Sequence, residues 1–149
     1  MNQPLTPRDA GIAALADVVQ LEMGYRLFTV MALDASREIN RRIWSSHPDL
    51  WPPGGEKPLP RTSELHRIVV ALGQPRLVEG RDAIRAAFAD HAAILAAGCE
   101  SALNMPVRWR GRTVGALNLL HVAGHYAGKD LARLAALADG AAPLLLMQT

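Results

Sequence analysis

The chain has 149 residues, enough for one domain with its own hydrophobic core, and its sixteen Lys and Arg against fourteen Asp and Glu give a net charge of +2. The arginines are scattered rather than gathered in a basic stripe, which argues against nucleic acid as a partner. The single cysteine cannot form an internal disulfide, and no apolar stretch reaches the roughly 20 residues of a membrane-spanning helix. With no secretory pattern at its start, we expect a cytoplasmic protein that binds no membrane.

The N-terminal part of the chain predicts a helix followed by a β-hairpin. Thr6 caps the helix, Pro7 occupies its first turn and Gly24 ends it. Residues 25–33 and 38–46 are rich in branched and aromatic side chains and predict paired strands, the first of them apolar on both faces and therefore central. Apolar residues recur at helical spacing along one face of the helix: Ile12, Leu15, Ala16, Val19 and Met23.

The middle of the chain predicts a loop and several short elements. Residues 47–60 hold prolines and paired glycines, which permit neither a helix nor a strand ladder. A helix follows over Thr62–Leu72, and residues 76–79 predict a short strand. Two helical turns come next, and the second covers Asp90–Ala97.

Residues 101–121 predict a second hairpin with a three-residue turn at Trp109-Arg110-Gly111. On that register Asn104 faces Ala116, so that Asn104 and Asn118 are diagonal neighbours on one face of the pair. The opposite face is apolar and belongs to a core: Leu103, Met105, Val107, Leu117 and Leu119.

A last helix begins at Asp130 and is bent or broken near Gly140 and Pro143. The order of elements alternates hairpins with helices, and the sequence contains no internal repeat or interdomain linker. We therefore expect a single α+β domain over residues 1–149, in which helices pack on an antiparallel sheet.

This order, together with residues 101–121, resembles the GAF domain family. The family pattern is a strand with a hydrophobic-Pro-hydrophobic step, here Met105-Pro106-Val107, a turn with Gly-Arg, here Gly111-Arg112, and a Gly-x-Leu strand, here Gly115-Ala116-Leu117. The resemblance covers nearly the whole chain. It implies a profilin- or PAS-like central antiparallel sheet of five to six strands, with the terminal helices on one face and short helices and loops forming a pocket on the other.

The resemblance also implies a class of function. Family members bind cyclic nucleotides, linear tetrapyrroles, haem or small metabolites, pass a signal to an attached effector, and commonly dimerise through the terminal helices. Tetrapyrrole-binding members attach the pigment to a cysteine followed by histidine, whereas Glu100 follows Cys99 here. The dispersed Asn-Lys-Phe-Asp-Glu pattern of cyclic-nucleotide binders is not found, and members that reduce free methionine sulfoxide need a second cysteine. We therefore expect a sensory or regulatory homodimer that binds an unidentified small molecule and signals in trans or through rearrangement of the dimer, with any cofactor unknown.

The first candidate ligand contacts are Asn104 and Asn118, because amides on a buried strand face must find partners and a bound ligand supplies them. The alternative is that both amides bond the backbone of neighbouring loops. The expected walls of the pocket are the helices over Thr62–Leu72 and Asp90–Ala97 and the loop after Trp44.

That loop carries further candidates. Aromatic rings with a few polar groups form a ligand wall if the loop folds over the sheet as a lid; otherwise its tryptophans only pin the loop. The candidate ligand contacts here are Trp44, His47, Asp49 and Trp51.

Cys99 and Ser101 lie at the junction between a helix and the second hairpin, and both are candidate ligand contacts. A nucleophilic Cys99 would need a base or a cationic setting, whereas an ordinary free cysteine fills a buried position. Three hypotheses remain open: a sensory binding domain, a small redox enzyme using Cys99 in the manner of methionine sulfoxide reductases, and a structural dimerisation module whose pocket is filled by its own side chains.

Two other clusters are weaker candidates. His121 and His125 have a spacing that suits a metal on a helix, but they follow a strand and lack a third ligand, so we expect no metal site. Arg108, Arg110 and Arg112 surround the hairpin turn, where they suit either an anion or a solvated tip. No Ser/His/Asp set or pair of carboxylates can be assembled, so we expect a binding protein rather than an enzyme.

Overall fold

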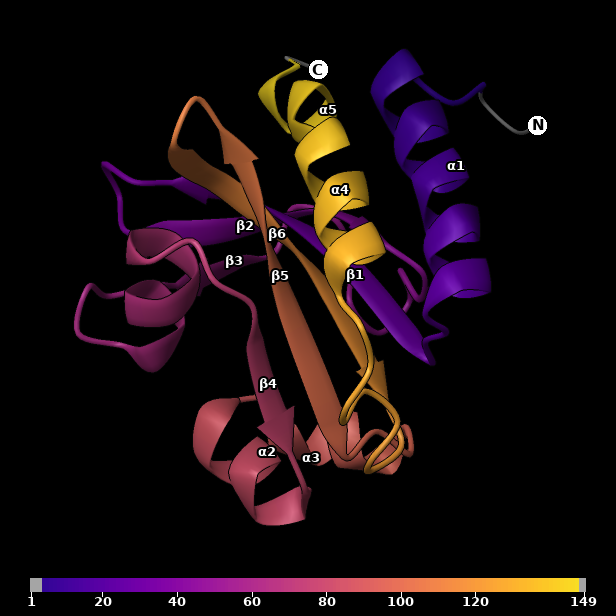
Figure 1. The fold of residues 1–149 in the computed structure, drawn as a ribbon, viewed down its shortest axis with the longest axis vertical. Helices are drawn as coiled ribbons and strands as arrows, with labels where there is room; N and C mark the ends of the chain where they lie inside the picture. The colour runs from indigo at the N-terminus through magenta and orange to yellow at the C-terminus, as the bar shows by residue number, and fades with distance from the viewer. Residues whose placement is uncertain (1–3, 148–149) are drawn as a thin grey trace.

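The computed structural model describes residues 4–147 and has the expected α+β architecture, a six-stranded antiparallel sheet in the order β3-β2-β1-β6-β5-β4 (Figure 1). The strands are β1 (Leu27–Asp34), β2 (Ile39–Ser45), β3 (Glu56–Pro58), β4 (Arg76–Glu79), β5 (Ser101–Trp109) and β6 (Arg112–His121). The helices are α1 (Pro7–Glu22), α2 (Arg81–Ala87), α3 (His91–Ala96), α4 (Ala132–Gly140), α5 (Ala142–Leu146) and a short π-helix, η1 (His66–Ala71).

One face of the sheet is covered by the N-terminal and C-terminal helices. Figure 1 shows α1 and α4 lying alongside each other, and both α4 and α5 contact the central strands. The main core lies between these helices and the sheet, and the apolar faces predicted for α1 and for the second hairpin both point into it. Its fully buried members include Ile12, Val19, Phe28, Leu103, Leu117 and Leu134.

The ends of the terminal helices follow the predicted signals. The hydroxyl of Thr6 accepts a hydrogen bond from the amide of Asp9 at 3.1 Å, and Gly24 ends α1 with a φ of +77°. The carboxylate of Asp130 accepts a bond from the amide of Ala132, the first residue of α4, at 2.9 Å. The expected break near Gly140 falls at Ala141, between α4 and α5.

The predicted loop over residues 47–60 is wrong at one place, because Glu56–Pro58 forms the edge strand β3 against β2. Pro58 is tolerated because an edge strand pairs on one side only. Gly54, with a φ of +93°, makes the turn that brings the chain back along β2. The loop therefore folds onto the sheet instead of extending into solvent.

The helix predicted over Thr62–Leu72 is present but shorter and wider than expected. Ser63 caps it by accepting a hydrogen bond from the amide of His66 at 3.1 Å. The amide of Leu72 then bonds the carbonyl oxygen of Arg67, five residues earlier, which is the π-helical pattern. The hydroxyl of Thr113 on β6 donates to the carbonyl oxygen of Val69 at 2.9 Å and fixes η1 to the sheet.

The predicted register of the second hairpin is wrong by two residues. Its turn has only two central residues, Arg110 and Gly111, both with positive φ, as a type I′ turn requires. A bulge between Val107 and Arg108 adds the second shift. Asn104 therefore pairs directly with Asn118. Because side chains alternate with a period of two, the shift leaves the residues beyond the bulge, including Asn104 and Asn118, on their predicted face.

No helix among the described residues, 4–147, has the length and apolar character needed to cross a bilayer.

Candidate functional site

The face of the sheet opposite the terminal helices encloses a cavity of about 740 Å³. Its floor is formed by β1, β2, β4, β5 and β6, and its walls by the segment leading into η1, by α2, by the start of α3 and by β3. This volume falls within the range of about 300–1,000 Å³ that is typical of small-molecule sites. The protein's own side chains therefore leave this pocket open. The hypothesis of a structural module requires a filled pocket, so the cavity argues against it.

A row of hydrogen-bonded polar side chains crosses the floor of this cavity. The guanidinium Nε of Arg76 on β4 donates to Oδ1 of Asn104 on β5 at 3.0 Å. Nδ2 of Asn104 donates to Oδ1 of Asn118 on β6 at 2.8 Å. Nδ2 of Asn118 in turn lies 3.4 Å from the hydroxyl oxygen of Thr29 on β1. Four adjacent strands thus contribute one polar side chain each.

The two amides lie on one strand face, as predicted, and both line the cavity. Their partners differ from the sequence-based alternative, because they bond side chains of neighbouring strands rather than loop backbone. Asn104 is only 2% exposed. Its amide orientation is set by Arg76, because a guanidinium can only donate and so requires the carbonyl oxygen to face it.

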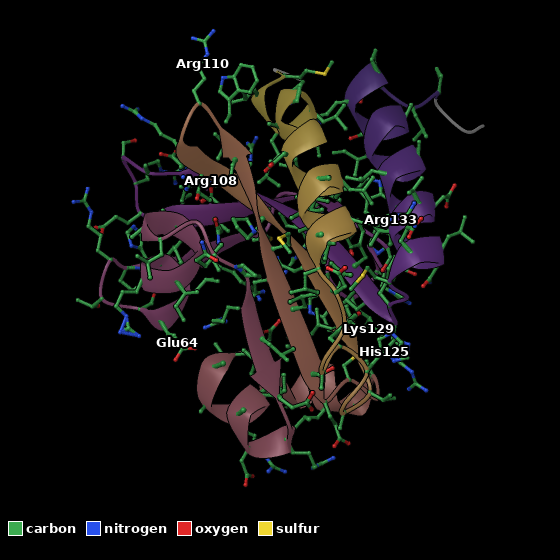
Figure 2. The ribbon with its side chains drawn as sticks, in the orientation of Figure 1. Glu64, Arg108, Arg110, His125, Lys129 and Arg133 are labelled. Atoms are coloured by element: carbon green, nitrogen blue, oxygen red, sulfur yellow. The ribbon has the colours of Figure 1, made fainter. Side chains whose placement is uncertain are left out.

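Arg76 was not predicted as a site residue. It is buried on β4, and burial lowers the pKa of its guanidinium while Glu64 opposes this shift. The carboxylate of Glu64, which lies just before η1 (Figure 2), is 3.5 Å from Nη1 of Arg76, and the ring of Phe88 lies 5.8 Å from the guanidinium carbon. The sequence carries no signal for this residue, because the burial of Arg76 and Val78, in alternation with the exposed residues of β4, is visible only in the structure.

Arg42 on β2 was also not predicted, although it is 7% exposed and lines the cavity. Its Nη1 donates to the carbonyl oxygen of Pro52 at 3.2 Å, and its Nε is buried with no partner among the described residues. Burial lowers the pKa of this guanidinium, and the negative charge of Asp90 partly opposes the shift.

The loop after Trp44 reaches the cavity through Trp51, which is 5% exposed. The indole Nε1 of Trp51 and the ammonium Nζ of Lys57 both donate to Oδ2 of Asp90, each at 3.1 Å. Burial raises the pKa of Asp90, but these two donors outweigh it and the pKa is lowered overall. The three residues tie the loop and β3 to the start of α3.

The other lid candidates lie outside the cavity. A bulge in the β1–β2 pairing leaves Ile43 without a direct partner, so Trp44 points to the helix-covered face and packs 5.8 Å from the ring of Phe28. His47 and Asp49 are exposed. Of the four predicted lid contacts, the structure brings only Trp51 to the cavity wall.

Cys99 and Ser101 also lie outside the cavity lining. Cys99 is 0% exposed and packs with Ile84, Ile94 and Leu120 in a second, smaller core cluster. Burial raises the pKa of its thiol, and the charge of Arg26 only partly opposes this. The hydroxyl of Ser101 donates to the carbonyl oxygen of Val122 at 2.9 Å. The structure thus gives Cys99 the surroundings of a core residue.

The histidine and arginine clusters are located away from this site. The rings of His121 and His125 stack at 3.7 Å, and among residues 4–147 no group of three His, Cys, Asp or Glu side chains suits a metal ion. At the hairpin, Arg108 folds back and donates to the hydroxyl oxygen of Thr113 at 2.8 Å, whereas Arg110 extends away from the molecule (Figure 2).

Comparison with known proteins identifies the fold. No protein-family model and no curated protein sequence matches the chain. Among solved structures, it is similar to the GAF domain of a phosphoenolpyruvate-protein phosphotransferase from Coxiella burnetii, with a TM-score of 0.75, 12% identity, and coverage of 94% of this chain and 83% of that one. It is also similar to the GAF domain of a two-component sensor histidine kinase from Bacillus halodurans, with a TM-score of 0.65, 17% identity and 92% coverage of both chains.

A third similar structure is an enzyme, the type II free methionine-R-sulfoxide reductase from Thermoplasma acidophilum, with a TM-score of 0.67, 17% identity, and coverage of 93% of this chain and 90% of that one. These similarities show that the chain has the GAF-domain fold, as the sequence resemblance implied. At such low identity the fold is shared by signalling proteins and by an enzyme, so function depends on the site.

We expect Asn104→Ala to lower the free energy of unfolding by about 2–3 kcal/mol, because it leaves the buried guanidinium of Arg76 without its acceptor. Asn118→Ala should cost less, about 1 kcal/mol, because it removes a neutral hydrogen bond at the cavity surface. Urea denaturation of both variants measures the difference. Equal losses would show that Arg76 does not depend on Asn104.

We expect Cys99 to react with a thiol reagent at pH 8 roughly 100-fold more slowly in the native protein than in urea, because burial excludes the reagent and raises the thiol pKa. Stopped-flow labelling at matched pH measures both rates. Native labelling at the rate of the unfolded chain would contradict the buried environment of Cys99 and would restore the redox hypothesis.

Proposed function

We propose that this chain is a non-catalytic regulatory domain that binds a small molecule in the cavity of about 740 Å³. The observation that carries the proposal is the combination of mostly apolar walls with a converging row of polar side chains, Arg76, Asn104, Asn118 and Thr29. The fold supports it further, since similar GAF domains occur in a sensor histidine kinase and in a phosphotransferase.

Binding is favoured over redox catalysis by the location of the chain's single thiol. A nucleophilic cysteine needs a depressed pKa and access to its substrate, whereas Cys99 has a raised pKa and is fully buried. Among the described residues that line the cavity there is neither a cysteine nor a histidine. The similarity to the Thermoplasma acidophilum reductase therefore supports a common fold and no common reaction.

Ligand binding would act on the rest of the domain through the elements that enclose it. The loop after Trp44 is held over the cavity by Trp51, Lys57 and Asp90, and β1 connects the cavity floor to the core under α1 and α4. A ligand that contacts both the floor and this loop shifts the population toward the closed arrangement. The terminal helices pack on the other face of the same strands, so this shift would alter how the helices pack on the sheet.

The terminal helices also offer a surface for a second copy of the chain, and a homodimer is part of this proposal. Val18 is 40% and Leu21 87% exposed on α1, while Leu146 and Met147 are 49% and 40% exposed at the end of α5. α1 and α4 lie together on this face and are joined by an ion pair of 3.0 Å between Arg133 and Glu22 (Figure 2). Pairing of two such surfaces would bury these apolar side chains.

The ligand is unidentified, and thermal unfolding tests cyclic nucleotides, amino acids, linear tetrapyrroles and haem one class at a time. A ligand at a hundred times its Kd stabilises the protein by about 2.7 kcal/mol, a shift of several degrees for a domain of this size. Asn118→Ala should raise the Kd of that ligand by about tenfold, which corresponds to the loss of one hydrogen bond.

The matched control is His47→Ala, which removes an exposed polar side chain outside the cavity and should leave the ligand-induced shift unchanged. Equal shifts in wild type and in Asn118→Ala would place the binding site elsewhere. Absence of a shift with every class would count against these classes of ligand.

Sedimentation velocity tests the dimer with the substitution Leu21→Glu. We expect wild type to sediment as a dimer and Leu21→Glu as a folded monomer, because a charge at this exposed position opposes only the association. Leu72→Glu is the control: Leu72 is 66% exposed, but it follows η1 on the cavity side and its substitution should leave the dimer intact. A wild-type monomer at all concentrations would overturn this part of the proposal.

A further inference from the structure

Arg42 is held against the cavity by the loop that covers it. The backbone amide of Arg42 donates to the carbonyl oxygen of Gly55 at 2.8 Å, and the amide of Gly54 donates to the carbonyl oxygen of Arg42 at 2.7 Å. A Cβ added at Gly55 would lie 2.9 Å from Nη1 of Arg42, so the loop backbone packs directly on the guanidinium. The side chain is therefore enclosed, with 7% of its residue surface exposed.

This enclosed guanidinium has unused hydrogen-bonding capacity. It carries five N–H donors, and Pro52 takes one of them at Nη1. Nε is buried and has no partner among the described residues. A buried charged donor without an acceptor is destabilising, whereas an acceptor placed in the cavity would remove that cost. Arg42 is one of the residues that line the cavity we propose as the ligand site.

Of the three basic side chains among the described residues that line the cavity, Arg42 is the one without an ion-pair partner. Lys57 pairs with Asp90 at 3.1 Å, and Arg76 pairs with Glu64 at 3.5 Å. Glu79 also borders the cavity, but both of its carboxylate oxygens accept a hydrogen bond from the amide of Gly124 at 3.0 Å, behind the strand end. Among residues 4–147 no carboxylate lies within ion-pair distance of Arg42, and the charge of Asp90 only partly opposes the effect of burial on its guanidinium.

A second unmet group is an acceptor. Oδ2 of Asp90 receives Trp51 and Lys57, whereas Oδ1 is buried and has no partner among the described residues. Asp90 lines the same cavity as Arg42. A cationic donor and an anionic acceptor, both buried and both without a partner among the described residues, thus belong to two residues that line one cavity.

We propose that the ligand is a small molecule whose anionic carboxylate or phosphate oxygens accept hydrogen bonds from Arg42, and whose own N–H or O–H group donates to Oδ1 of Asp90. This inference rests on the proposed small-molecule function and specifies the chemistry of its ligand. A planar guanidinium matches the paired oxygens of either anion, and an anionic group placed here lies beside a buried positive charge that has no direct ion-pair partner among the described residues.

Nitrogen-15 NMR of the Arg42 Nε–Hε group tests the proposal even while the ligand is unidentified, with its resonance assigned by its loss in Arg42→Met. The probes are sodium acetate, glycine, inorganic phosphate and neutral acetamide, each titrated to about 50 mM, well above the Kd that suits such small fragments. We expect a saturable shift with at least one of the three charged probes and none with acetamide. Comparison of the Kd values of acetate and phosphate shows whether the site prefers a carboxylate or a phosphate. A lower Kd for glycine than for acetate indicates that the N–H group of glycine donates to Asp90.

Three variants complete the test. Arg42→Met should weaken the anion at least tenfold, measured on the side-chain amide resonances of Asn118, and Arg42→Lys, which keeps the charge but loses the planar fork, should also weaken it. Asp90→Asn should abolish the advantage of glycine over acetate. Arg41→Gln is the matched control, because Arg41 is exposed on the opposite face of the same strand.

An Arg42 resonance that none of the charged probes moves, or that acetamide moves equally, overturns the proposal. Unchanged anion binding in Arg42→Met does the same. A ligand from the thermal panel that stabilises wild type and Arg42→Met equally would overturn the anion inference while leaving the small-molecule function in place. Failure of both the panel and these probes would remove the two together.

Discussion

The constraint on which this structure depends is that its sheet is covered on both faces, so a polar side chain on the second face has little access to water. Asn104 meets this constraint through two strand neighbours, accepting from Arg76 and donating to Asn118. Direct strand pairing makes this possible, because residues opposite each other on adjacent strands have their side chains within hydrogen-bonding distance. The polar side chains of the row can therefore be buried, because each finds its hydrogen-bond partner on a neighbouring strand.

The polar row also has a direction, since every donor and acceptor in it is determined by the guanidinium at one end. The cavity above it combines these fixed dipoles with charges from β2, β3 and the start of α3, brought together by the loop that ends in Trp51. Rigid strands thus position the floor, while a loop and short helices form the roof. This division suits a site that must recognise a ligand and also respond to it.

Sequence reasoning identified the fold because its signals are local: capping residues, helical periodicity and alternating strands survive any change in tertiary detail. It located Asn104 and Asn118 on one face despite the wrong register, since a shift of two residues preserves the face. It missed Arg42 and Arg76, because an arginine in a strand is ordinarily exposed and only the tertiary cover shows otherwise. It assigned Trp44 to the lid because the bulge that separates Trp44 from Arg42 has no sequence signal.

The short strands at the two edges of the sheet have a consequence for how this domain can associate. β3 has three residues and ends in Pro58, which has no amide hydrogen to donate, and β4 has four residues. Edges this short give another chain few backbone groups with which to extend the sheet. The domain therefore resists strand addition and fibrous aggregation through its edges, and the homodimer that we propose uses its helical surface instead.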